Sequence, residues 1–124
     1  MVNSKKGHLK NERETWLRTL DYIQQENVFL KNHLADIIKN DIKPEMLEQV
    51  EYFQNQFINK DAVIALLRYD IANQNRLSEH GIEHNGDFVK LQARQGKLRG
   101  DMEKMEREFS RLKFQFNTYI AETL

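Results

Sequence analysis

The chain has 124 residues, and its 19 Lys and Arg side chains balance its 19 Asp and Glu side chains. This balance excludes the strong positive field of a dedicated nucleic-acid binder or a polybasic membrane protein. The length is that of one domain, so we expect a single domain over residues 1–124. Without cysteine the chain has no disulfide, thiolate metal site or thiol nucleophile, and we expect a cytoplasmic protein.

The first residues, MVNSKKGHLKNERETW, contain lysines with no apolar segment behind them. We therefore expect neither a signal peptide nor a membrane anchor. No apolar run approaches the roughly 18 residues that span a bilayer. Residues 1–8 are predicted to form a flexible tail ahead of the first helix.

Apolar residues in the first predicted helix, about 10–40, recur every three or four positions. This spacing is a heptad seam with one polar member, Asn27. The seam consists of Trp16, Leu20, Ile23, Asn27, Leu30, Leu34 and Ile37. The helix is predicted to end within KNDIKP, because Pro44 disfavours helical geometry at Lys43.

The second predicted helix, about 44–79, starts at Pro44, a residue suited to the first helical position. Its seam has two polar members, Lys60 and Gln74. The whole seam is Met46, Val50, Phe53, Phe57, Lys60, Ile64, Leu67, Ile71 and Gln74. We favour a continuous helix, although a break near Asp61, which is suited to capping a new helix, would give a four-helix bundle instead.

The third predicted helix, about 87–122, has the most regular seam and a single polar member, Gln95. Its members are Phe88, Leu91, Gln95, Leu98, Met102, Met105, Phe109, Leu112, Phe116 and Tyr119. Asp87 is the predicted N-cap. Gly96 and Gly100 each cost about 1 kcal/mol in a helix interior, so either a neighbour packs closely there or the helix is locally soft.

The predicted fold is all-α, with three long antiparallel helices in up-down-up order and heptad packing like that of a coiled coil. Short connections between long helices require antiparallel neighbours. A turn near residue 83 brings Gln74 level with Gln95, where the two amides would hydrogen-bond. We propose the four polar seam members as residues that fix the helix register. They are Asn27, Lys60, Gln74 and Gln95.

The stretch from His80 to His84 reads as H-x-x-E-H. It resembles the motif of inverted zinc peptidases, in which two histidines hold zinc and a glutamate acts on water. No third ligand is specified, however, and Gly81 lies inside the motif where the chain must reverse. We interpret the stretch as a polar turn and expect no metal and no cofactor.

The chain also lacks E-x-x-H pairs, a serine elbow and a glycine-rich phosphate loop, so we expect no enzyme.

Apolar residues outside the seams are the main functional signal. They are candidate interface residues: Phe114 and Ile120 in the third helix, and Leu47, Ile58, Val63, Leu66 and Tyr69 in the second. A monomer with a broad core and a homodimer both explain them, and we lean to the homodimer. The predicted function is a protein interaction, adaptor or scaffold module with a second copy of itself among its partners. The alternative, a nucleic-acid-associated protein using basic residues of the third helix, is weakened by interleaved acidic residues.

Overall fold

The chain contains only one proline and five glycines. The computed structural model describes residues 2–124, and most of them form three long helices. These are α1 (Val2–Asn40), α2 (Leu47–His80) and α3 (Asn85–Thr123). A short 3-10 turn, η1 (Pro44–Met46), precedes α2. The described part of the chain is all-α and contains no strand. Side chains are described from residue 4 onward.

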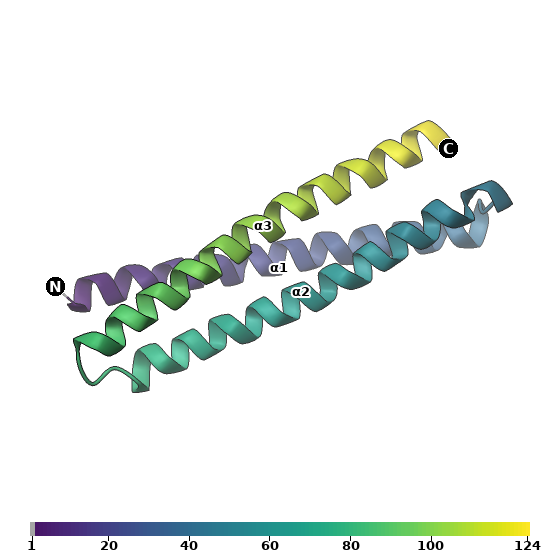
Figure 1. The fold of residues 1–124 in the computed structure, drawn as a ribbon. Coiled ribbons are helices and arrows are strands. Elements are labelled where there is room, and N and C mark those ends of the chain that lie inside the picture. The colour runs from purple at the N-terminus through teal and green to yellow at the C-terminus, as the bar shows by residue number, and fades with distance from the viewer. Residues whose placement is uncertain (1) are drawn as a thin grey trace.

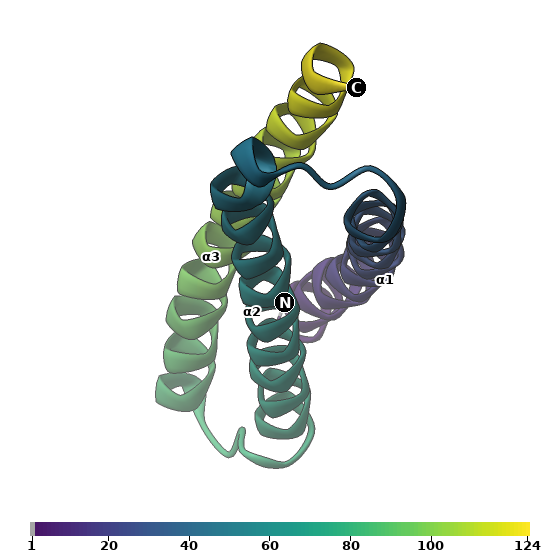
Figure 2. The same ribbon diagram turned by 90° about the vertical axis from the view of Figure 1, so that its right-hand side faces the viewer.

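The three helices pack side by side in the predicted up-down-up order (Figure 1). α1 and α3 run in the same direction, α2 runs in the opposite direction, and α2 packs along both (Figure 2). Helix α2 is unbroken through residues 59–61. The structure therefore contains the continuous second helix and not the four-helix alternative.

The start of α1 differs from the prediction. The sequence predicted a flexible tail over residues 1–8, whereas the helix already begins at Val2; residue 1 lies outside the described residues. No proline interrupts a helix over residues 2–8, and just after them the carbonyl oxygen of Leu9 accepts a hydrogen bond from Nε2 of Gln95 at 2.8 Å. This hydrogen bond attaches the helical turn around Leu9 to α3.

The connections between the helices follow local rules. Lys43 is extended, as a residue before proline prefers, and Pro44 opens η1. At the other end, the N–H of Gly81 donates to the carbonyl of Leu77 at 2.9 Å and closes α2. Helix α3 begins at Asn85, two residues before Asp87, the predicted N-cap. The carboxylate of Asp87 instead reaches back to accept the N–H of Glu83 at 3.1 Å.

The three predicted seams form the core. All of their members are buried except Trp16 and Tyr119, which are partly buried and pack against the core. Phe57 and Phe116 are fully buried and meet edge to face with ring centroids 5.1 Å apart, an arrangement that aromatic pairs favour. Phe53 completes this aromatic cluster at 5.2 Å from Phe116. The heptad spacing therefore accounts for which face of each helix is buried.

Candidate interaction surfaces

The outer face of α2, opposite its buried seam, carries a second line of apolar residues. We call it the α2 outer seam, and it consists of Ile58, Ala62, Ala65, Tyr69 and Ala72, all exposed. Its members step by four and three residues, as in a helix that packs against a partner helix. Ile58 is 60% exposed and Tyr69 is 69% exposed. Leu66, also exposed, lies beside the seam.

One flank of this seam is held by ion pairs to α1. Asp61 lies 2.5 Å from the Lys31 ammonium group. Arg68 pairs with Asp21 at 2.7 Å and donates to Gln24 at 2.6 Å. These ion pairs attach α2 to α1 beside the seam, so the position of the seam relative to the bundle is fixed.

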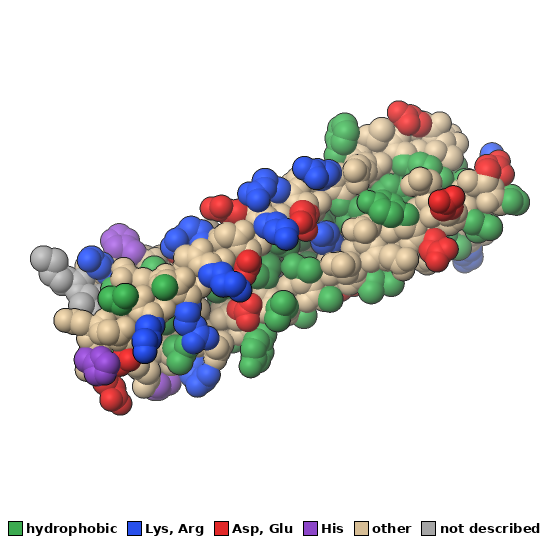
Figure 3. Space-filling view, in the orientation of Figure 1, with side chains coloured by type: hydrophobic (Ala, Val, Ile, Leu, Met, Phe, Trp, Pro, Cys, Tyr) green, Lys and Arg blue, Asp and Glu red, His purple; other side chains and the backbone are tan. Residues whose placement is uncertain are grey.

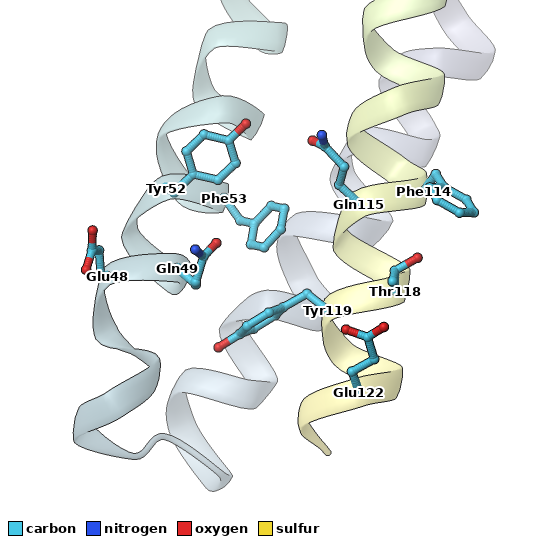
Figure 4. A pocket seen from close by; sticks show the side chains of 9 residues that line it. All are labelled: Glu48, Gln49, Tyr52, Phe53, Phe114, Gln115, Thr118, Tyr119 and Glu122. Atoms are coloured by element: carbon cyan, nitrogen blue, oxygen red, sulfur yellow. The ribbon is translucent and has the colours of Figure 1, made fainter.

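A second apolar feature lies where α3 passes the start of α2. An open groove of about 610 Å³ is lined by aromatic side chains from both helices, among them Tyr52, Phe53 and Tyr119, with Glu48 and Glu122 at its margins (Figure 4). Tyr119 points toward α2, whereas Phe114 points away from it. The groove thus combines aromatic walls with carboxylates.

The predicted interface residues divide into two groups. Leu47, Ile58, Leu66, Tyr69 and Phe114 are exposed. Val63 and Ile120 are partly buried and pack against the core. The first group is available to a partner. The other two residues widen the core, which accounts for part of the apolar residues that lie outside the seams.

The four polar seam residues are all buried, and each donates a hydrogen bond to another helix. Asn27 donates from Nδ2 to the carbonyl of Phe57 at 2.9 Å and to Asp61 at 2.8 Å. The ammonium group of Lys60 lies 3.2 Å from the Glu108 carboxylate. These contacts join specific levels of neighbouring helices, while their role in fixing register stays a prediction.

Gln74 and Gln95 lie at one level, as the sequence predicted. Nε2 of Gln74 donates to Oε1 of Gln95 at 3.2 Å and to the carbonyl of Leu91 at 3.2 Å. Nε2 of Gln95 also donates to Glu12 at 2.9 Å. Gln95 is fully buried and connects all three helices.

The network also contains a buried arginine that the sequence did not predict. Arg13 is only 2% exposed. It donates from Nε to Asn75 at 2.5 Å and from Nη1 to Gln95 at 2.8 Å. A signal was present, because Arg13 precedes Trp16 by three residues and so extends the α1 seam by one position. Arginine is usually exposed in proteins, so the sequence did not predict that Arg13 is buried.

Electrostatics strengthen the edge of this network. Hydrogen bonds from Arg99, at 2.6 and 2.7 Å, lower the pKa of the Glu12 carboxyl. Burial lowers the pKa of Arg13, because a low-dielectric interior disfavours the charged form. Farther along the bundle, the hydrogen bond from Lys113 lowers the pKa of Glu26. α1 and α3 are therefore joined by charged pairs at two separate levels.

The two ends of the bundle differ in charge, and Figure 3 shows acidic side chains near one end and basic side chains over the other half of this face. The acidic end contains Asp36, Asp41, Glu45, Glu48, Glu51 and Glu122 against Lys39 and Lys43. The basic end contains Lys5, Lys6, Lys10, Arg13, Arg76, Lys90 and Arg94 against Glu12, Glu14, Glu79, Glu83 and Asp87. On α3, Arg99 and Lys113 pair with carboxylates of α1. Binding of nucleic acid through α3 stays a prediction.

The H-x-x-E-H stretch spans the turn between α2 and α3. His80 is the last residue of α2, and His84 precedes the first residue of α3. Both side chains are largely exposed. Within residues 2–124 as described, no group of three His, Asp or Glu side chains is placed to hold a metal ion. The two histidines therefore do not share one helical face.

The fold defines the chain as a three-helix bundle with coiled-coil-like packing. Comparison with protein-family models, with curated proteins and with solved structures found no match. None of the helices, as far as they are described, has an apolar stretch long enough to cross a bilayer.

Proposed function

We propose that this chain is a non-enzymatic helical interaction protein, an adaptor or scaffold of the cytoplasm, whose partners include a second copy of itself. The observation that supports this most directly is the α2 outer seam. A helix that has already buried one heptad seam in its own bundle carries a second line of apolar residues at the same spacing on its outer face. Such a surface is typical of a helix that contacts another helix.

The arrangement of the exposed residues supports the same function. Along the edge of the molecule where α2 runs, apolar side chains follow one another (Figure 3). Burying apolar surface contributes roughly 25 cal/mol per Å², so covering Ile58, Leu66 and Tyr69 favours association. The near-neutral net charge does little to oppose it.

Light scattering coupled to size exclusion tests the proposal. We expect a mass of two chains that shifts toward one chain as the protein is diluted through the micromolar range. A mass of one chain at every concentration would overturn self-association.

A further inference from the structure

We infer that the α2 outer seam packs against the same seam of a second copy, with the two α2 helices antiparallel and a two-fold axis passing between residues 63 and 64. This inference rests on the proposed function and specifies its partner, face and direction. A two-fold interface uses one surface twice, so the seam must be complementary to itself when reversed. The residues along it meet this requirement.

The centre of the reversed pair is small and its flanks are large. Ala62 lies at the level of the partner's Ala65, and two such layers allow the helices to approach to about 8 Å, the short end of helix packing distances. One turn outward, Ile58 meets the partner's Tyr69, and symmetry repeats the contact. Both side chains are more than half exposed in the single chain. The antiparallel pairing therefore covers the two largest residues of the seam.

Charge favours this direction over the parallel one. Beyond Ile58 the line continues through Asn55 to Glu51, and beyond Tyr69 through Ala72 to Arg76. The antiparallel alignment sets Glu51 against the partner's Arg76, and it brings Asp61 within one helical turn of the partner's Arg68. Glu48 faces the partner's Glu79 only at the outermost layer. A parallel alignment would instead set Glu51 and Arg76 against their own counterparts, and like charges at such positions are destabilising.

Charge is distributed along the whole molecule in the same direction as along the seam. The start of α2 belongs to the acidic end and its last turn to the basic end. Antiparallel chains bring the acidic end of one beside the basic end of the other, whereas parallel chains place like ends together. Complementary charge of this kind sets the direction of association more than its strength.

Cysteine cross-linking tests the direction, because the chain has no cysteine of its own. We would prepare Asn55→Cys and Ala72→Cys separately, give one a tag that changes its size, and oxidise each alone and both together. Both positions are exposed on α2. The inference places Asn55 level with the partner's Ala72, so we expect a disulfide-linked dimer in the mixture.

Each variant alone should stay unlinked. Two copies of residue 55 would lie about 25 Å apart along the helices, whereas a disulfide needs Cα atoms roughly 4.4–6.8 Å apart. Links within each variant alone would indicate parallel helices and overturn the inference. Ser110→Cys on α3, which is exposed and away from the seam, mixed with Asn55→Cys controls for random collision and should give no link.

A substitution at the centre separates this inference from the proposed function. Ala65→Glu keeps a good helix former but sets two carboxylates near the axis, so we expect unchanged helix content and a fall in mass from two chains to one. Ala93→Glu, an exposed alanine of α3, should leave the mass at two chains. Suppose that the unmodified chain and Ala65→Glu are both dimeric and that no link forms between positions 55 and 72. The inferred interface on the α2 outer seam is then wrong, whereas the proposed self-association is supported. If the unmodified chain is a single chain throughout, both fail.

Discussion

Arg13 of α1 donates from Nη1 to Oε1 of Gln95 on α3 at 2.8 Å, and both residues are buried. Amide oxygens of Gln95 and Asn75 accept the hydrogen bonds of this buried cation. A charge held this way depends on each partner, since a buried charge that loses one becomes costly. The stability of this part of the bundle therefore depends on both amides, and Gln95 is the one that also contacts Gln74.

We expect Gln95→Leu to lower the free energy of unfolding by about 2–4 kcal/mol, because Arg13 and Gln74 each lose an acceptor in the interior. Urea denaturation at one fixed protein concentration measures this. The double variant Arg13→Met with Gln95→Leu should cost less than the two single changes together, since it removes the buried charge with its partner. Gln92→Leu, an exposed glutamine one turn earlier on α3, serves as the control and should have little effect. A Gln95→Leu effect as small as that of Gln92→Leu would contradict the role of the amide.

The pair of Glu12 and Arg99 predicts a dependence on pH. Hydrogen bonds from Arg99 lower the pKa of Glu12 below its ordinary value of 4.5. A group whose pKa is lower in the folded chain adds stability that is complete above the unfolded value and is lost as the pH falls through the folded value. We expect Glu12→Gln to be less stable than the unmodified chain at neutral pH, by a few tenths to about 1 kcal/mol, and this difference to shrink below pH 4.5.

Urea denaturation over a series of pH values measures that difference. Glu122→Gln, an exposed glutamate near the end of α3, is the matched control. Its difference from the unmodified chain should stay small and change little with pH. A constant gap between Glu12→Gln and the unmodified chain would show that the ion pair is not its source.

The sequence was sufficient to predict the core residues, because in a heptad bundle the buried positions recur at the spacing of the seam. Lys60 and Gln95 were placed correctly by spacing alone, although their chemistry is typical of a surface. Arg13 was not, because the predicted α1 seam begins at Trp16 and arginine is typical of a protein surface. The groove beside Phe53 and Tyr119 was also missed, because it depends on the distance between α2 and α3, and a periodic pattern does not specify that distance.

The aromatic cluster predicts a contrast between two phenylalanines. Phe57 is fully buried against Phe53 and Phe116, whereas Phe114 is 71% exposed. We expect Phe57→Ala to cost about 3–5 kcal/mol, the usual loss when a large core side chain leaves a cavity. Phe114→Ala should change stability by no more than about 0.5 kcal/mol. Thermal and urea unfolding at matched concentration measure both, and equal effects would contradict the assigned core.

Gly100 and Gly81 have opposite surroundings. A Cβ added at Gly100 meets nothing within 4 Å, so no close packing requires glycine there, and alanine is the better helix former. We expect Gly100→Ala to raise the free energy of unfolding by up to about 1 kcal/mol. At Gly81 the added Cβ would lie 2.9 Å from the carbonyl oxygen of Leu77, a backbone atom that closes α2. Gly81→Ala should therefore destabilise the chain by about 1–3 kcal/mol. Urea midpoints compare the two variants directly, and a loss of stability in Gly100→Ala would reveal a close neighbour at α3, such as a partner chain, that the single bundle does not contain.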